Sequence, residues 1–216
     1  MTRILLADDH AIVRDGLKSM LEDEKDMQVI AEAEDGRQAV ALTHEINPDV
    51  VIMDVAMPDL NGVEATRQII SDKLDVKVIA LSMHSETRFI SRMLQAGARG
   101  YLLKDCAFHE LARAIRAVLD GQIYLSPQIT GVVVEDYLQH LGGKAEEAPE
   151  LLTARQREVL QLMAEGCSTK QIAERLHVSV KTIETHRQHI MEKVDVHSVA
   201  ELTKYAIREG LTSLHN

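Results

Sequence analysis

The stretch VVIMDVAMPDLNG, residues 50–62, joins an apolar run to an acidic residue and a turn. The run at residues 50–53 contains no polar residue. Near-continuous apolar runs of this length are typical of strands in a parallel sheet that is covered on both faces. Asp54 follows the run directly, and Asn61-Gly62 is a turn signal before the next helical segment. We therefore predict a buried parallel strand with Asp54 at its carboxyl end.

The same pattern recurs through the first 122 residues. Short apolar runs occupy residues 4–7, 29–31, 50–53, 76–81 and 101–103. Between and after them, apolar residues follow helical spacing: Ile12, Leu17 and Leu21; Ala39, Leu42 and Ile46; Val63, Ile69 and Ile70; Ile90, Met93 and Leu94; Leu111, Ile115 and Leu119. These five βα units predict an α/β fold, a doubly wound five-stranded parallel sheet with the order 2-1-3-4-5.

The strand signal ends near residue 123. Residues 128–141 favour a short helix, and GGKAEEAPE at residues 142–150 is typical of an exposed linker. The rest is helical, with helices predicted over 155–165, 169–176, 180–193 and 198–209. The short break at residues 177–179 indicates a helix-turn-helix. We expect three parts: the α/β domain at 1–122, a linker with a short helix at 123–150, and a small all-α helix-turn-helix domain at 151–216.

Composition constrains the function. The formal net charge of −10 argues against nucleic acid when taken as a total, since polyanion binders are usually basic. The charge is uneven, however: residues 1–122 carry net −7, residues 123–150 net −4 and residues 151–216 net +1. Two cysteines exclude a disulfide framework and a four-ligand zinc site. The early charges exclude a secretory leader and no run of 18 apolar residues exists, so we expect a cytoplasmic protein with no membrane contact.

Polar residues follow four of the predicted strands. Asp8 and Asp9 follow the first strand, Asp54 the third, Ser82 the fourth and Lys104 the fifth. Ligands of open α/β sheets bind outside the carboxyl ends of the strands, so these side chains are expected to converge. Three adjacent carboxylates call for a hard divalent cation, most plausibly Mg²⁺. The alternative is that Asp8 and Asp9 only cap the following helix.

Residues 1–122 resemble the receiver domain of two-component response regulators. The motifs that carry the resemblance are Asp8-Asp9, the segment 53–58 (MDVAMP), Asn61-Gly62, Ser82 and the segment 100–104 (GYLLK). The resemblance implies that Asp54 accepts a phosphoryl group from a sensor histidine kinase. It also implies that Asp9, Asp54 and the backbone carbonyl of Ala56 hold Mg²⁺, with Asp8 acting through water.

The resemblance assigns three further roles. Lys104 would pair with a phosphoryl oxygen, Ser82 would donate a hydrogen bond to another, and Tyr101 would be a switch whose ring moves inward. Many receivers have Pro after the Lys, whereas this chain has Asp105. Because a cis bond before a non-Pro residue costs about 2.5–4 kcal/mol, we predict a trans Lys104–Asp105 bond.

Two other function classes are weighed against this one. A Mg²⁺-dependent phosphatase with an aspartyl-phosphate intermediate usually has an acid/base carboxylate two residues after the nucleophile, where this chain has Ala56. A nucleotide- or flavin-binding module needs a glycine- or hydroxyl-rich first βα loop, whereas this loop has two carboxylates. Both classes are disfavoured.

The third helix of the second domain has two distinct faces at about 100° per residue. Ile183, His186, Ile190 and Val194 form an apolar stripe for the core. The opposite face and its flanks offer groups that reach DNA bases and phosphates. The candidate DNA-contacting residues are Lys181, Glu184, Thr185 and Gln188 on that face, Thr182, Arg187 and His189 beside it, and Lys170 on the preceding helix. The alternative is a solvated amphipathic helix.

The whole second domain resembles a LuxR-type helix-turn-helix. The resemblance rests on residues 152–160 (LTARQREVL), 164–166 (AEG), 172–176 (IAERL), 178–187 (VSVKTIETHR) and 190–193 (IMEK). Gln156 replaces the usual Glu of that family, which puts any ion pair there in doubt. Together the two domains resemble a NarL/FixJ-type response regulator, which implies binding to double-stranded DNA and a homodimer when phosphorylated. Val199, Leu202 and Ala206 of the last helix either pair the protomers or pack within one domain.

Overall fold

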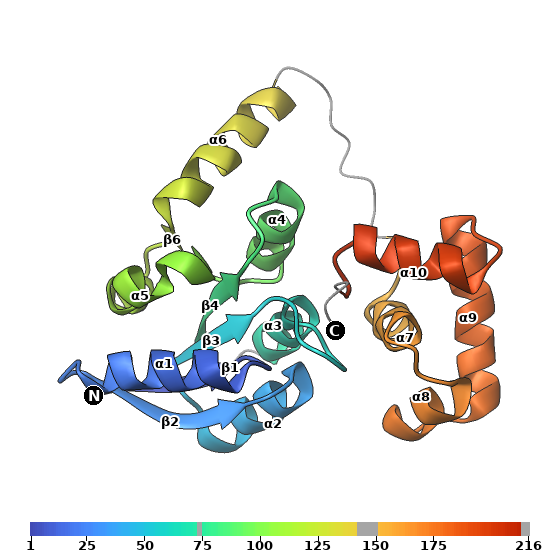
Figure 1. The fold of residues 1–216 in the computed structure, drawn as a ribbon, viewed down its shortest axis with the longest axis horizontal. Helices are drawn as coiled ribbons and strands as arrows, with labels where there is room; N and C mark the ends of the chain where they lie inside the picture. The colour runs from blue at the N-terminus through green and yellow to red at the C-terminus, as the bar shows by residue number, and fades with distance from the viewer. Residues whose placement is uncertain (73–74, 142–150, 213–216) are drawn as a thin grey trace. The chain divides into compact units, whose positions relative to one another are not determined.

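The computed structural model of this chain describes residues 1–72, 75–141 and 151–212. The chain divides into two compact units, Met1–Lys144 and Ala145–Asn216 (Figure 1). The predicted linker at residues 142–150 lies outside the described residues. Among the described residues, no helix combines the length and apolar character needed to cross a membrane.

The first unit is a parallel sheet with helices on both faces. Its strands are β1 (Thr2–Ala7), β2 (Met27–Ala33), β3 (Val50–Asp54), β4 (Lys77–Ser82), β5 (Gly100–Leu103) and β6 (Tyr124–Leu125). Its helices are α1 (Ala11–Glu22), α2 (Gly36–Ile46), α3 (Gly62–Ser71), α4 (Thr87–Gln95), α5 (Lys104–Leu119) and α6 (Pro127–Leu141). The strand order β2-β1-β3-β4-β5-β6 confirms the predicted order of the first five strands.

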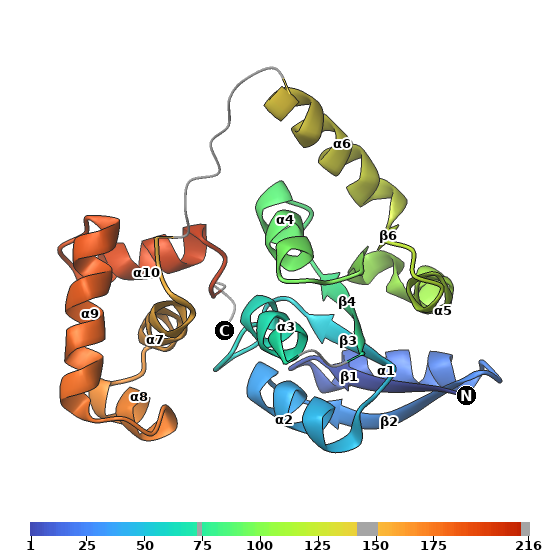
Figure 2. The same ribbon diagram turned by 180° about the vertical axis from the view of Figure 1, so that it is seen from behind.

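Helices cover both faces of this sheet (Figures 1 and 2), and an apolar core lies on each face. Successive residues of a strand point to opposite faces, so each strand contributes to both cores. In β3, for example, Val51 and Met53 join the core under α2, α3, α4 and α6, whereas Ile52 joins the core under α1 and α5. This two-sided burial explains why the strands are near-continuous apolar runs.

Residues 123–141 correct the predicted end of the first domain. Residues 124–125 form a sixth strand, in which Tyr124 pairs with Gly100 in parallel register. Ile129 of α6 is fully buried in the core, and Val132 and Val133 pack against it. The prediction of a linker from residue 123 was wrong here because a two-residue strand produces no periodicity that a sequence reading can detect. The predicted short helix is present and belongs to the first unit.

Helix α1 also differs from its predicted apolar stripe. Leu17 and Leu21 are buried as expected, but Ile12 is 83% exposed. Arg14 is buried in its place, with 7% of its surface exposed. A cation therefore occupies a core position of this helix.

The second unit is a small helical domain built around a helix-turn-helix. Its helices are α7 (Ala154–Ala164), α8 (Thr169–Arg175), α9 (Val180–Val194) and α10 (Val199–Arg208). Ser or Thr caps the amino end of each helix, as the side-chain oxygens of Thr153, Ser168, Ser179 and Ser198 accept backbone N–H groups. His177, with φ of 52°, turns the chain between α8 and α9. Leu160, Ile172, Ile183, Ile190 and Leu202 are buried in one core.

Gln156, which stands where LuxR-type domains usually have Glu, forms hydrogen bonds both at the start of α7 and to α9. Gln156 is buried at the third position of α7, where it forms a capping box with Thr153. Its Oε1 also accepts a hydrogen bond of 2.9 Å from Lys193 Nζ at the end of α9. A neutral amide therefore joins α7 to α9 through a hydrogen bond.

Gln156→Glu is expected to stabilise the second unit. The carboxylate would pair with the Lys193 ammonium and lie near the positive end of the α7 dipole, which together contribute about 0.5–1 kcal/mol. Calorimetry at low ionic strength should show a higher Tm for this unit, and added salt should reduce the gain. The matched control Gln156→Ala removes the cap and should lower the Tm. A lower Tm for Gln156→Glu would contradict this reading of the contact.

Candidate functional site

The carboxyl edge of the sheet brings Asp8, Asp54, Ser82 and Lys104 together, as predicted. Asp8 lies just beyond β1, Asp54 ends β3 and Ser82 ends β4, and all three are buried. Lys104 Nζ lies 2.7 Å from Asp8 Oδ2 and 2.8 Å from Asp54 Oδ2. One ammonium therefore bridges two buried carboxylates that come from neighbouring strands.

Asp9 and His10 complete the acidic cluster. Ligand atoms of Asp8, Asp9, His10 and Asp54 all lie within 4.8 Å of one another. His10 Nδ1 is 2.8 Å from Asp9 Oδ1 and 3.2 Å from Asp8 Oδ1. Asp8 Oδ2 and Asp9 Oδ1 are buried yet make no well-aligned hydrogen bond among the described residues, although Lys104 Nζ lies near the first and His10 Nδ1 near the second. Carboxylate oxygens with unused acceptor capacity are a donor set that fits Mg²⁺.

The alternative reading of Asp8 and Asp9 as helix caps was wrong. The N-cap residue of α1 is His10, and no side chain caps this helix. Asp8 Oδ1 accepts the backbone N–H of His10 at 2.9 Å, which orders the turn rather than the helix end.

Burial and like charge raise the pKa of Asp54. Desolvation and the neighbouring Asp8 carboxylate raise this pKa to about 6, although the Lys104 ammonium and the N–H of Ala56 act in the opposite direction. Burial alone would lower the pKa of Lys104, but the Asp54 and Asp8 carboxylates outweigh it and raise the pKa. Lys104 therefore remains a cation. Its single positive charge does not balance the Asp8 and Asp54 carboxylates when both are ionised.

The turn after β3 fixes Asp54 from the backbone side. The N–H of Gly62 donates to the carbonyl of Val55 at 3.0 Å, and Asn61 caps α3. A Cβ at position 62 would lie 1.9 Å from the backbone oxygen of Asp54, closer than any atom pair tolerates. The Asn-Gly pair therefore does more than turn the chain, because only glycine lets α3 approach the phosphoacceptor candidate.

Ser82 and Tyr101 are connected through the loop after β4. The hydroxyl of Ser82 accepts the backbone N–H of His84 at 3.0 Å, and the Tyr101 hydroxyl donates to the carbonyl of His84 at 2.8 Å. Tyr101 is fully buried, and burial raises the pKa of its phenol. The ring already lies inward in this structure, whereas the resemblance implies a ring that moves inward when the switch operates. The His84 ring stacks on Phe89 of α4 with centroids 4.5 Å apart.

Two further predictions concern the backbone, at Ala56 and at the Lys104–Asp105 peptide bond. The N–H of Ala56 donates to Asp54 Oδ1 at 3.3 Å. No peptide bond among the described residues is cis, which confirms the trans Lys104–Asp105 bond.

The predicted DNA-contacting residues line the outer side of α9. Lys181, Glu184, Thr185, Gln188 and His189 are exposed, whereas Ile183 and Ile190 are buried. Thr182 and Arg187 are partly buried, and Lys170 of α8 is exposed. Of the predicted core stripe, Ile183 and Ile190 are buried, whereas His186 and Val194 are only partly buried.

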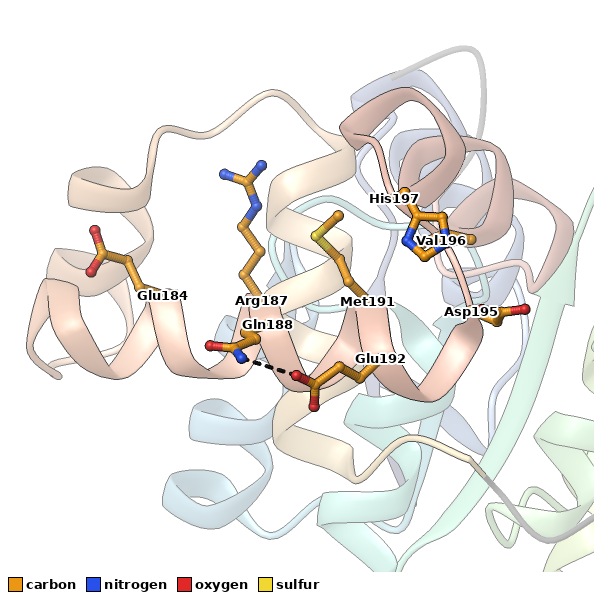
Figure 3. A pocket seen from close by; sticks show the side chains of 8 residues that line it. All are labelled: Glu184, Arg187, Gln188, Met191, Glu192, Asp195, Val196 and His197. Carbon is orange, nitrogen blue, oxygen red and sulfur yellow. Dashed lines mark hydrogen bonds between the residues drawn. The ribbon is translucent and has the colours of Figure 1, made fainter.

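A pocket of about 400 Å³ lies along the same helix and the loop before α10 (Figure 3). It is lined by Glu184, Arg187, Gln188, Met191, Glu192, Asp195, Val196 and His197. Gln188 Nε2 donates to Glu192 Oε1 at 2.9 Å along its edge (Figure 3). Its rim carries more acidic than basic groups, so the carboxyl half of α9 is less suited to phosphate than the amino half with Lys181.

The last helix packs mainly within its own domain. Leu202 and Ala206 of α10 are buried in the core of the second unit. Val199 remains 44% exposed. Of the two readings of this apolar set, intradomain packing accounts for two residues, and only Val199 is left for contact with a partner.

Three residues near the site were missed or left aside by sequence reasoning. His10 follows an acidic pair, and His84 follows Ser82 by two, and neither position carries a distinctive pattern. Arg14 had a signal, because it precedes Leu17 and Leu21 by three and seven residues and so belongs to the buried stripe of α1.

Comparisons with known proteins agree for both units. Residues 4–116 match the response regulator receiver domain, and residues 150–206 match the bacterial regulatory proteins of the luxR family. The chain is 37% identical over 221 residues to the transcriptional regulatory protein DegU of Brevibacillus brevis, covering 96% of this chain and 94% of that protein. It is 40% identical over 213 residues to the transcriptional regulatory protein LiaR of Bacillus subtilis (strain 168), covering 99% of this chain and 100% of LiaR.

Solved structures show the same likeness. The response regulator RcsB of Salmonella typhimurium is 26% identical, with a TM-score of 0.57 and coverage of 94% of this chain and 97% of that chain. RcsB in a complex with DNA matches with the same identity and TM-score, covering 94% of this chain and 96% of that chain.

Asp54→Asn is expected to stabilise the first unit in Mg²⁺-free buffer at pH 8. The folded-state pKa of Asp54, about 6, lies above its ordinary value of 3.8. Below pH 4 the Asp54 carboxyl is protonated in both the folded and the unfolded chain, so its burial carries no ionisation penalty. The free energy of unfolding then falls as the pH rises through 6, because the unfolded chain ionises more readily than the folded one. The Asn variant avoids this loss, which is worth about 1–3 kcal/mol.

Denaturant unfolding of both proteins between pH 4.5 and 8 measures this difference. The gain should shrink toward zero at the acidic end. Asp15→Asn, at an exposed position of α1, is the control and should show no such pH dependence. A gain that is independent of pH would mean that the buried charge is not its cause.

Proposed function

The chain belongs to the two-component response regulators that join a receiver domain to a LuxR-type DNA-binding domain, and from this premise we propose that Asp54 is its phosphoacceptor. It is thus a DNA-binding transcription regulator. One observation carries the proposal: Asp54 is a buried carboxylate that shares the Lys104 ammonium with the Asp8 carboxylate at the edge of the sheet.

The phosphoryl group would come from a phosphohistidine of a sensor histidine kinase. One Asp54 carboxylate oxygen attacks the phosphorus atom and forms a P–O bond. The P–N bond breaks, and its electron pair stays on the imidazole nitrogen of the kinase, which takes a proton from solvent. The product is an acyl phosphate on Asp54. Because this step needs the ionised carboxylate, Asp54 must lose its proton before it reacts.

Mg²⁺ fits the same cluster. Asp9, Asp54 and the backbone carbonyl of Ala56 would hold it, with Asp8 contributing through water. When bound, the ion offsets the repulsion between the carboxylate and the anionic phosphoryl donor.

Lys104 and Ser82 would receive the new phosphoryl group. Lys104 already lies 2.8 Å from Asp54, so its ammonium is placed to pair with a phosphoryl oxygen. Ser82 would donate its hydroxyl hydrogen to another oxygen. The Ser82 hydroxyl accepts the N–H of His84, and Tyr101 donates to the carbonyl of His84. A shift of Ser82 would therefore disturb the Tyr101 contact, and this is the proposed switch.

The second unit would bind double-stranded DNA through the amino half of α9. Lys181, Thr182, Thr185 and Gln188 offer ammonium, hydroxyl and amide groups for phosphates and base edges, and Glu184 would accept from a cytosine amine. Lys170, Arg187 and His189 would add phosphate contacts. This domain carries a net charge of only +1, so a single copy should bind DNA weakly. A homodimer formed on phosphorylation adds a second half-site and would compensate for this.

We infer a cytoplasmic location, because the DNA and the phosphorylating kinase domain are reached there. Turnover is not expected beyond slow loss of the phosphoryl group, since position 56 is an alanine and supplies no general acid or base. The family match also removes support from the phosphatase alternative.

Phosphorylation of Asp54 can be measured with a small phosphodonor. Incubation of the full chain with acetyl phosphate and Mg²⁺ should add one phosphoryl group, detected by intact-protein mass spectrometry. Asp54→Asn should abolish this mass increase, whereas Asp15→Asn should retain it. Equal incorporation in the Asp54→Asn variant and the wild type would refute the assignment.

DNA binding through α9 predicts a specific salt dependence. Lys181→Ala and Arg187→Ala should each weaken DNA binding and reduce the slope of log K against log salt by about 1. Lys204→Ala, at an exposed position of α10, is the matched control and should leave the slope unchanged. Unchanged affinity in both α9 variants would show that this helix does not face the DNA.

A further inference from the structure

Arg14 is a buried cation that the phosphorylation chemistry above does not use. It lies on α1, one turn after the acidic turn, and its side chain is 9% exposed. A charged side chain is rarely buried unless each of its polar groups has a partner. The partners of its guanidinium therefore indicate which part of the structure Arg14 stabilises.

The guanidinium joins the turn after β1 to β2. Its Nη1 donates to the backbone carbonyl of Asp8 at 2.5 Å. Its Nε lies 3.4 Å from Glu32 Oε2, and its Nη2 lies 3.2 Å from Glu34 Oε1. The planar fork of Arg can satisfy three acceptors in fixed directions, which the point charge of Lys cannot.

Asp8 is consequently held at both of its backbone groups. Its N–H donates to the carbonyl of Ala33 at the end of β2 at 3.1 Å, and its carbonyl accepts from Arg14. Asp8 and Asp9 are adjacent, so a rotation of this peptide would move both carboxylates relative to Asp54. Metal sites need their ligands held within about 0.5 Å, and loss of such outer contacts typically costs about 10–100-fold in metal affinity.

A second cation, Lys18, allows the contact of Arg14 with the acidic turn to be distinguished from neutralisation of the Glu32 charge. Lys18, one turn further along α1, pairs with the same Glu32 through a contact of 2.9 Å. Arg14 differs from Lys18 in two contacts, to Glu34 and to the carbonyl of Asp8, and of these the second fixes the acidic turn. If Arg14 served only to neutralise Glu32, then Lys18 and Arg14 would be equivalent.

We propose that Arg14 is a positioning residue for the metal-binding turn: its guanidinium fixes the Asp8 peptide against β2, and so sets the affinity of the Asp8, Asp9 and Asp54 cluster for Mg²⁺. This inference rests on the proposed function of that cluster. Arg14 would act through the Asp8 peptide, since its guanidinium contacts the Asp8 carbonyl, Glu32 and Glu34.

The test is Arg14→Lys in the full chain, which keeps the charge and removes the fork. Isothermal titration calorimetry with Mg²⁺ alone, at a temperature where each protein is fully folded, measures the Kd. Arg14→Lys should raise the Kd for Mg²⁺ about tenfold and slow labelling by acetyl phosphate at subsaturating Mg²⁺. Saturating Mg²⁺ should restore most of the labelling rate, which a general loss of structure would not allow.

Lys18→Ala is the matched control. It breaks the pair with Glu32 but leaves the Asp8 carbonyl untouched, so its Kd for Mg²⁺ should stay within about twofold of the wild type. A wild-type Kd in Arg14→Lys, or equal losses in both variants, would overturn the proposal. The result for Asp54→Asn is independent: labelling of that variant would refute the phosphoacceptor assignment, whereas the Mg²⁺ titration alone decides the role of Arg14.

Discussion

The main physical constraint on the first unit is the free-energy cost of burying several carboxylates close together. Asp8 and Asp54 are almost fully buried at the ends of neighbouring strands, and a single ammonium bridges them. Burial and mutual repulsion raise the pKa of Asp54 to about 6, so the site has unsatisfied negative charge. That imbalance fits a divalent cation, which would be a new partner for carboxylate oxygens that are now only partly satisfied.

The surrounding structure holds these groups in place largely through the backbone. Gly62 lets α3 begin against the carbonyl of Asp54, and Arg14 holds the carbonyl of Asp8. The loop after β4 connects Ser82 to Tyr101 through the two backbone groups of His84. The loop between β4 and α4 is therefore tied to both Ser82 and Tyr101 through the backbone of one residue.

The second unit differs from the first in that most residues on the outer face of one helix, α9, are exposed. Its core is apolar and its helices are capped by hydroxyl side chains. The exposed face of α9 mixes one cation at its amino end with amides, hydroxyls and carboxylates. A surface with so little excess positive charge gives only weak general attraction to DNA.

The order of the strands, the acidic edge of the sheet and the two faces of α9 could be predicted from the sequence, because each depends on a repeated local pattern. Apolar runs mark the buried strands, and Asp8, Asp54, Ser82 and Lys104 fall at their ends. Tertiary structure alone decided the sixth strand, the partners of Arg14 and the inward position of Tyr101. These depend on which distant groups come within hydrogen-bond distance: Tyr124 beside Gly100, Arg14 beside the Asp8 carbonyl, and Tyr101 beside His84. Local pattern reports which side of an element is buried, but the partner that satisfies a buried polar group is known only once the chain has folded.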